Sequence, residues 1–132
     1  MVDQPRAVAR FLNADGVPPP GGHYSHIVAC SGWIFLSGHL PIPPNGVHDP
    51  AADIEVQVER VLDNIEASLA TAGVSWVNLL KVNVYLTSLD DWDDFNRLYA
   101  KRLGSHKPAR CAIYTPSLHF GYRIEIDAIG SS

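Results

Sequence analysis

The sequence lacks the features that mark most nucleic-acid-binding and membrane proteins. Lysine and arginine number only 10 against 14 acidic residues, which gives a net charge of −4. Because a protein devoted to holding nucleic acid needs a basic face, this balance argues against nucleic acid as the partner. No run approaches the roughly 18 apolar residues of a membrane span, and residues 1–5 lack the regions of a signal peptide. We therefore predict a cytoplasmic protein that does not bind membranes.

Cysteine is also scarce. Cys30 and Cys111 are the only two, and their spacing fits neither a metal site nor a redox pair, so two reduced thiols are expected. Six histidines are present, and His23 and His26 lie close together, but no HExxH helix, cysteine pair or acidic ligand at fixed spacing accompanies them. The sequence therefore predicts no metal site.

What the sequence does contain is typical of one globular domain. The chain has 132 residues, of which 46% are hydrophobic and 18% charged. This length is near the commonest domain size, and the composition rules out a disordered chain. No repeat and no domain boundary interrupts it. We expect a single domain over residues 1–132.

Hydrophobic periodicity and turn signals predict the order strand, strand, strand, helix, strand, helix, strand, strand. The expected strands are 6–12, 26–30, 33–37, 79–86 and two near Arg110 and Arg123, and the expected helices run from Asp49 to Gly73 and from Asp90 to Gly104. This order predicts an α+β fold in which two helices cover one face of a sheet. Nothing remains to cover the other face, and an uncovered face of this size predicts a closed homo-oligomer.

The two C-terminal strands carry the most informative residues. If they form a hairpin that closes near Tyr114 and Gly121, Arg110 lies opposite Glu125 on one polar face, because side chains alternate along a strand. A guanidinium beside a carboxylate can grip a small carboxylic acid and hold a water against it. From these two residues alone, a structural ion pair is the better-supported interpretation.

Several short motifs, in order, carry a resemblance to a known family. They are Gly22-His23-Tyr24-Ser25, Ser37-Gly38-His39-Leu40, Asp53 with Gln57 and Asn64, residues 81–87, Phe95-Asn96 with Tyr99, Pro108-Ala109-Arg110, and residues 124–129. No single motif is decisive, but their order and spacing match over residues 5–130. On these motifs the chain resembles the RidA (YjgF) family of enamine/imine deaminases.

The resemblance implies a chorismate-mutase-like mixed sheet and a homotrimer whose sheets form a central barrel. It places the active sites in clefts between subunits, which agrees with the uncovered sheet face. It implies hydrolysis of reactive 2-enamino and 2-imino acids, such as 2-aminoacrylate, to 2-keto acids and ammonia. It implies neither a cofactor nor a metal.

The resemblance also implies roles for individual residues. Arg110 would bind the substrate carboxylate in a bidentate contact, and Glu125 would hold and polarise the attacking water. Tyr24 would line the cleft and contact the substrate. The further substrate-binding positions that it implies are Ser37, Gly38 and Asn96. Because an ion pair for stability would not need Tyr24 and Asn96 in the same pattern, the resemblance favours a functional role for Arg110 and Glu125.

The chain departs from the common family pattern around the expected cleft. His39 stands where glutamine is frequent, Ala112 where some deaminases carry cysteine, and His119 where a proline usually follows the leucine. His39 is either a hydrogen-bonded structural histidine or a substrate-binding residue that enters the cleft. Cys111 should face away from Arg110, and we interpret it as a buried small apolar residue rather than a nucleophile.

Three functions therefore remain open from the sequence. The first is the deaminase, the second a noncatalytic protein that binds a 2-keto acid or similar metabolite, and the third an endoribonuclease, an activity attributed to some relatives. Retention of Glu125 with Arg110 favours catalysis over binding, and the acidic charge argues against a nuclease. The physiological substrate and the pathway do not follow from the sequence.

Overall fold

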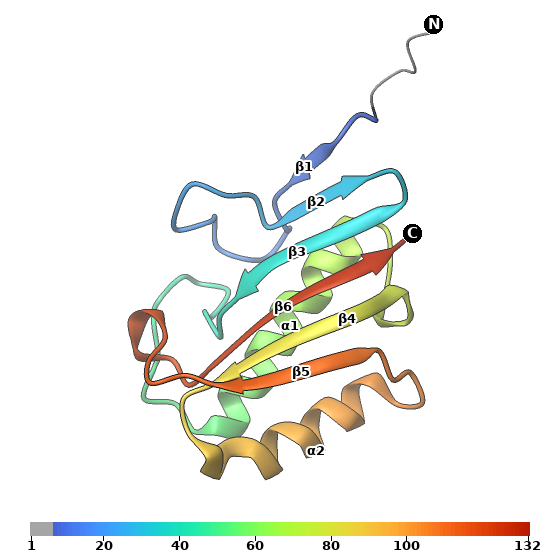
Figure 1. The fold of residues 1–132 in the computed structure, drawn as a ribbon. Coiled ribbons are helices and arrows are strands. Elements are labelled where there is room, and N and C mark those ends of the chain that lie inside the picture. Colours follow the sequence, from blue (N-terminus) through green and yellow to red (C-terminus); the bar gives the residue numbers. More distant parts are fainter. Residues whose placement is uncertain (1–6) are drawn as a thin grey trace, which may run out of the picture.

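A computed structural model describes residues 7–132 of the chain. Its elements are β1 (Arg10–Leu12), β2 (Ile27–Cys30), β3 (Trp33–His39), α1 (Ile54–Thr71), η1 (Trp76–Asn78), β4 (Leu79–Leu86), η2 (Leu89–Asp91), α2 (Trp92–Leu103), β5 (Ala109–Tyr114), η3 (His119–Gly121) and β6 (Ile124–Ser131), where η marks a short 3₁₀ turn (Figure 1). The predicted order of strands and helices is confirmed. The segment tested for a signal peptide and the start of the predicted first strand lie outside the described residues.

The six strands form one mixed sheet in the order β1-β2-β3-β6-β4-β5. Strand β6 lies between β3 and β4 and is antiparallel to both, whereas β5 is parallel to β4 at the sheet edge. The predicted hairpin of the two C-terminal strands is therefore wrong. Because β4 lies between β5 and β6, the segment from Thr115 to Arg123 passes the end of β4 before β6 begins. It spans two strand spacings, or roughly 10 Å.

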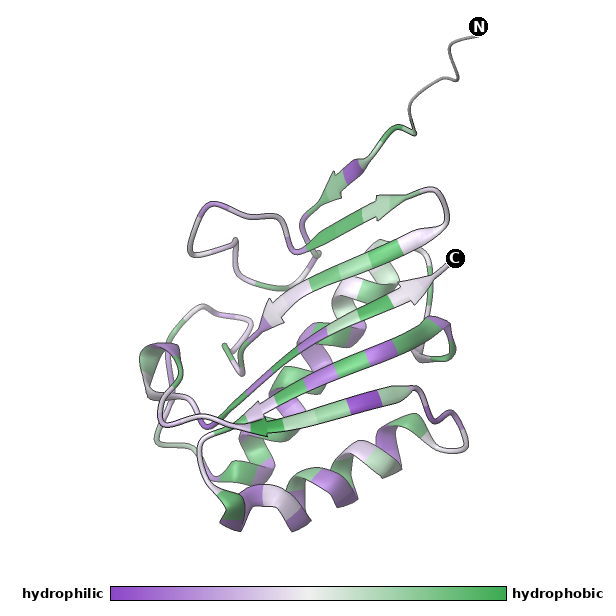
Figure 2. Ribbon diagram, viewed as in Figure 1, coloured by the Kyte–Doolittle hydropathy of each residue, from purple (hydrophilic) through white to green (hydrophobic). Residues whose placement is uncertain are grey.

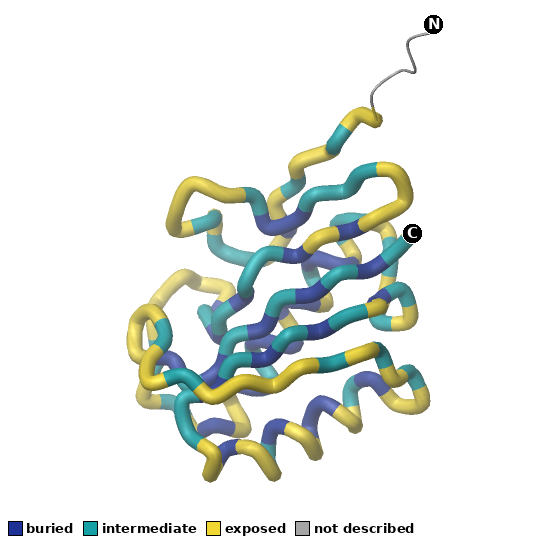
Figure 3. The backbone as a smooth tube through the Cα atoms, viewed as in Figure 1, coloured by how far each residue is buried: buried dark blue, intermediate teal, exposed yellow. Residues whose placement is uncertain are grey.

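Both helices cover the same face of the sheet, as Figure 1 shows. The core between the layers includes Val58, Leu62 and Ile65 from α1, each with no exposed surface. From the sheet, Val84 and Ile126 face these residues and are equally buried. Apolar and buried residues alternate with polar and less buried ones along β4 and β6 (Figures 2 and 3). This alternation agrees with a sheet that packs helices on one side only.

The first helix begins later than predicted, at Ile54 rather than near Asp49. The Asp49 carboxylate binds the Arg60 guanidinium at 2.9 Å instead of capping the helix, and the Asp49 carbonyl closes a turn by accepting the amide of Ala52. The predicted end is confirmed, because Gly73 follows the helix with φ of 77°, a conformation that suits glycine.

Large apolar side chains remain exposed on the uncovered face and at the sheet edges. On β3, Trp33 and Phe35 alternate with the buried Ile34 and Leu36. Strand β5 is exposed along almost its whole length, which Figure 3 shows as a yellow edge. A long, exposed edge strand of this kind readily pairs or packs with another chain. Between residues 7 and 132, no helix is long and apolar enough to cross a membrane.

Candidate active site

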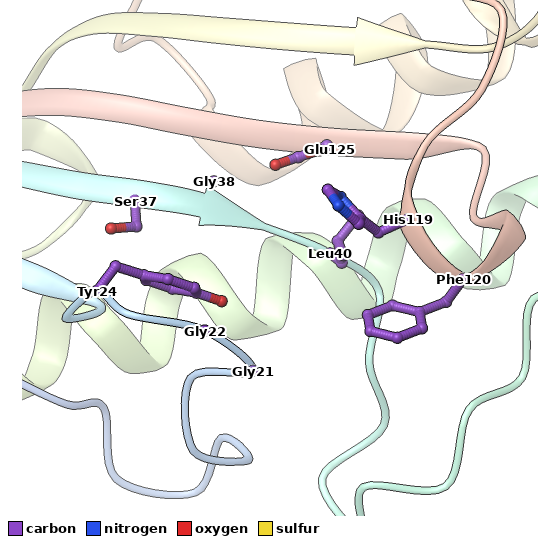
Figure 4. A pocket seen from close by; sticks show the side chains of 9 residues that line it. All are labelled: Gly21, Gly22, Tyr24, Ser37, Gly38, Leu40, His119, Phe120 and Glu125. Carbon is purple, nitrogen blue, oxygen red and sulfur yellow. The ribbon is translucent and has the colours of Figure 1, made fainter.

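An open pocket of about 430 Å³ lies at the end of the sheet where β3 ends and β6 begins (Figure 4). Its lining residues are Gly21, Gly22, Tyr24, Ser37, Gly38, Leu40, His119, Phe120 and Glu125. Four of the residues predicted for the site, namely Tyr24, Ser37, Gly38 and Glu125, are thus brought together. They come from the segment before β2, from β3 and from β6, which are far apart in the sequence.

Glu125 is the acid of this pocket. It pairs with Tyr85 of β4 on the uncovered face of the sheet, and its side chain is half-buried. Burial raises the pKa of its carboxyl above the ordinary value, and the charge of Asp127 raises it further, while His119 acts in the opposite direction. A carboxyl poised in this way can accept a proton from a water molecule.

Gly38 lies where the pairing of β3 with β6 shifts register, between Leu36 and His39. A β carbon added at Gly38 would lie 3.1 Å from Cδ of Glu125 and closer still to Oε1. The absence of a side chain at this position therefore makes the space that the Glu125 carboxyl occupies.

Backbone contacts fix the segment that carries Tyr24. The hydroxyl of Ser37 donates to the carbonyl oxygen of Ser25 at 2.6 Å, and the Ser37 amide donates to the His26 carbonyl at 3.0 Å. The Tyr24 side chain is 50% exposed and forms the wall opposite Glu125 in Figure 4. Ser37 thus holds the wall in place, and its own hydroxyl is already engaged by the backbone.

His39 is not among the residues that line this pocket. It is buried; its Nδ1 donates to the carbonyl oxygen of Ser37 at 2.6 Å, and its Nε2 accepts from the hydroxyl of Ser68, also at 2.6 Å. A carbonyl can only accept, so these partners fix the neutral tautomer. Burial lowers the pKa of His39 to about 4. Of the two roles open from the sequence, this geometry supports the structural one.

Buried amides on α1 hold the chain that forms the remaining wall. Asn64 donates to the carbonyl oxygens of Leu40 at 2.9 Å and Ile42 at 3.0 Å. Gln57 donates to two carbonyls of the segment before α1 and accepts from the amide of Arg123, just before β6. These contacts explain Gln57 and Asn64, two residues of one sequence motif, as positioning residues, because buried polar groups need hydrogen-bond partners.

Arg110 is not part of this pocket within one chain. It pairs with Val82, which faces the helices, whereas Glu125 lies on the uncovered face, one strand away. The expectation that Arg110 lies opposite Glu125 is therefore wrong for a single chain. The cause is the strand order, because β4 separates β5 from β6.

The Arg110 guanidinium is held by α2 instead. Nη1 donates to Oδ1 of Asn96 at 3.0 Å, so two residues that were predicted for the site are in direct contact. The guanidinium carbon lies 5.1 Å from the ring centre of Trp92, 5.5 Å from that of Phe95 and 4.9 Å from that of Tyr99. Cation–π contacts of this kind orient a charged group without neutralising it. The sequence motifs included Phe95 and Tyr99, but nothing in the sequence related these rings to Arg110.

A second groove of about 380 Å³ lies beside Arg110 at the edge of the sheet. Its lining residues include Asn96, Tyr99, Lys107 and Arg110. The Tyr99 hydroxyl is buried and has no hydrogen-bond partner among residues 7–132. Burial raises the pKa of Tyr99, which the nearby charge of Arg110 partly offsets.

Sequence reasoning placed the turn at His119 near the expected cleft but gave neither His119 nor Phe120 a role, although both line the pocket with Glu125. The available signal was the departure of this turn from the family pattern. Cys111, in contrast, is exposed rather than buried, because β5 is an edge strand and the face that carries Cys111 is uncovered. Within the described part of the chain, no group of three or more histidine, cysteine or acidic residues could hold a metal ion.

Comparison with known proteins gives consistent matches over nearly the whole chain. The family model described as Endoribonuclease L-PSP matches residues 16–131. A RutC family protein from Pyrococcus horikoshii is 37% identical over 115 residues, which is 87% of this chain and 91% of that protein.

Solved structures agree with these sequence matches. RidA from the Antarctic bacterium Psychrobacter sp. is 30% identical with a TM-score of 0.87, covering 93% of this chain and 99% of that chain. TdcF from E. coli, solved with bound serine, is 27% identical with a TM-score of 0.87, covering 93% and 98%. The six-stranded sheet with its two helices is thus the fold of these neighbours.

Proposed function

Because this chain belongs to the Endoribonuclease L-PSP family, which includes RidA and RutC proteins, we propose that it is an enamine/imine deaminase. It converts 2-enamino and 2-imino acids, such as 2-aminoacrylate, to 2-keto acids and ammonia. The observation that carries this proposal is the half-buried Glu125 carboxyl, which faces an open pocket and has a raised pKa. A carboxylate receptor without catalysis has no need of such an acid.

The proposal places the complete site between two subunits of a homotrimer. One subunit contributes the pocket with Glu125 and Tyr24, and its neighbour contributes Arg110 from the exposed edge strand β5. Two features support this arrangement: the exposed apolar side chains of β3 and β5, and the separation of Arg110 from Glu125 within one chain. Stacking on three rings and a bond to Asn96 would present the Arg110 guanidinium to a substrate carboxylate.

The chemistry that we propose needs little beyond positioning. An enamine tautomerises to the imine, water attacks the imine carbon, and the adduct collapses with loss of ammonia. Glu125 holds the water and takes its proton, while Arg110 fixes the substrate through its carboxylate. The serine bound to TdcF is an amino acid, and an imino acid has the same carboxylate with an imine nitrogen in place of the amine.

The family description also names an endoribonuclease, but no feature of this pocket favours RNA. Its described lining contains no lysine or arginine to bind phosphate, and the whole chain has a net charge of −4. The noncatalytic binder uses the same pocket and is distinguished by the experiment below.

The test is keto-acid formation from 2-aminoacrylate that a pyridoxal-phosphate enzyme generates in situ. Wild type should accelerate it, and Arg110→Ala and Glu125→Gln should not. Arg97→Ala and Glu55→Gln are matched controls, because this exposed pair contacts neither groove and should retain the rate. The oligomer mass of each variant is measured alongside.

The possible results separate the proposed functions. Failure of a folded wild type to accelerate the reaction would reject 2-aminoacrylate as substrate. Binding of a 2-keto acid by that same inactive protein would then support the binder, and cleavage of RNA would support the nuclease.

A further inference from the structure

The pocket contains a titratable side chain that the proposed mechanism leaves unused. His119 belongs to η3, in the connection between β5 and β6, and it lines the pocket together with Glu125. In Figure 4 its imidazole extends toward the side of the pocket where the Glu125 carboxyl lies. Tyr24 and Phe120 form the walls around the space beside both groups. A substrate in this space would contact the acid and the imidazole together.

The backbone that presents His119 has an uncommon conformation. Phe120, the next residue, has φ of 61°, and Gly121 follows with φ of 79°. A side chain as large as phenylalanine rarely adopts the left-handed region, and such residues concentrate at functional sites. The turn therefore has to be held by packing around it.

The loop before α1 supplies that packing. The His48 ring stacks on the Phe120 ring with 4.1 Å between centres and 22° between planes. His48 Nδ1 lies 2.9 Å from the Tyr122 hydroxyl, which also accepts the Asp49 amide at 3.2 Å. Tyr122, which directly follows the turn, is almost completely buried, so its contacts anchor the C-terminal end of the turn to the core. His119 is thus presented by a fixed turn, although its own side chain is exposed.

His119 lies near enough to Glu125 in the pocket for its positive charge to lower the pKa of the Glu125 carboxyl. The groups that act on the Glu125 carboxyl are His119 from η3 and Asp127 from β6, while Tyr85 of β4 is itself influenced by Glu125. His119 is the group that favours the ionised carboxylate, against burial and Asp127. The pocket therefore pairs one acid with one imidazole, which is the minimum set for moving two protons in opposite directions.

We propose that His119 is a second catalytic acid–base residue, which protonates the substrate nitrogen while Glu125 removes a proton from the attacking water. This inference rests on the proposed deaminase function. In the first step the water oxygen bonds to the imine carbon, its proton moves to Glu125, and the C=N electron pair takes a proton from the His119 imidazolium. The product of this step is a neutral adduct that carries one hydroxyl and one amino group.

In the second step the two residues exchange roles. Glu125 returns its proton to the amino group, and the C–N bond breaks with its electron pair on nitrogen, so that ammonia leaves. The hydroxyl proton moves to His119, and the C=O bond of the keto acid forms. Both residues regain their starting protonation, and the net reaction is imine plus water to ketone plus ammonia. A single carboxyl would have to make all four transfers itself.

The experiment compares keto-acid formation by wild type, His119→Gln, His119→Gly and the control His23→Gln, an exposed histidine that does not line this pocket. His119→Gln should lower kcat about 100-fold with little change in KM. Added imidazole should restore activity to His119→Gly but not to Glu125→Gln. An effect confined to KM, an unchanged rate, or no rescue by imidazole would each overturn the role of His119.

A readout without turnover covers variants that bind or assemble poorly. Carboxyl ¹³C NMR of Glu125 should show a higher pKa in His119→Gln than in wild type, because the substitution removes the group that lowers the pKa of this carboxyl. An unchanged pKa would overturn the coupling. An inactive wild type overturns the proposed function and this inference together, whereas an active wild type with an equally active His119→Gln overturns only the latter.

Discussion

Gly38 and Glu125 face each other so closely that a single methyl group on Gly38 would occupy the position of the Glu125 carboxyl. The conflict would involve the far end of a flexible side chain, so Glu125 could move away at little cost in stability. Gly38→Ala should therefore keep the fold and lower turnover about 100-fold, since small misplacements of a catalytic group have effects of this size.

The matched comparison is Gly21→Ala, because an atom added at Gly21 would meet nothing within 4 Å. We expect it to retain most of the rate, as measured by the same keto-acid assay with the melting temperature of each variant. Equal rates for the two variants would show that Glu125 does not act from the position described above.

A site shared between subunits predicts complementation. Arg110→Ala and Glu125→Gln are each expected to be inactive, but after unfolding, mixing and refolding, some clefts will contain the intact residue from each variant. For equal amounts and random assembly into a ring, roughly a quarter of the clefts should be intact. Keto-acid formation by the mixture measures this fraction, and an inactive mixture of confirmed hetero-oligomers would place Arg110 and Glu125 in separate sites.

The buried His39 predicts a pH dependence of stability. Its pKa in the folded chain, about 4, is below the ordinary 6.5, so the unfolded chain binds the additional proton between these values. The lowered pKa of His39 therefore contributes about 3 kcal/mol to the free energy of unfolding. This contribution is complete above pH 6.5 and is lost as the pH falls toward 4.

Glutamine is a suitable replacement for His39, because its amide can donate to Ser37 and accept from Ser68 without titrating. In urea unfolding, His39→Gln should lose less stability than wild type between pH 7 and pH 4.5. Parallel losses in the two proteins would mean that another group determines the acid sensitivity.

Removal of the hydroxyl should change the stability of the protein in opposite directions at Tyr99 and at Tyr85. The Tyr99 hydroxyl is buried and unpaired among the described residues, whereas that of Tyr85 donates to Asp127 at 2.9 Å. Tyr99→Phe should leave the free energy of unfolding unchanged or raise it by about 1 kcal/mol, and Tyr85→Phe should lower it by about as much. A clear loss of stability in Tyr99→Phe would show that its hydroxyl has a partner in the assembled protein.

The sequence predicted local structure well because local structure depends on neighbouring residues. The alternation of Lys81, Val82 and Asn83 and the glycine after α1 were sufficient to predict a strand and a helix end. The strand order was not accessible in this way, because nothing near Arg110 or Glu125 encodes that β4 lies between them. The incorrect prediction that the two C-terminal strands pair as a hairpin was based only on their proximity in the sequence.

The site was predicted in the same uneven way. Tyr24, Ser37, Gly38 and Glu125 were placed by the family resemblance, and the structure brings them into one pocket. His119 was placed near the expected cleft but given no role, because the direction of its side chain depends on the left-handed turn at Phe120, which no periodic pattern signals. The contact of the α2 rings with Arg110 was not predicted, because Arg110 lies on a strand that follows the helix in the chain.

The central position of β6 has a consequence for synthesis. The strands β1 to β3 and the pair β4 and β5 join only through β6, which the ribosome makes after all of them. Without β6, the strand order leaves β1 to β3 and the pair β4 and β5 with no strand that connects them. The strand that joins the two parts of the sheet is thus the strand that carries Glu125. Completion of the sheet and placement of the Glu125 carboxyl in the pocket therefore occur in the same folding step.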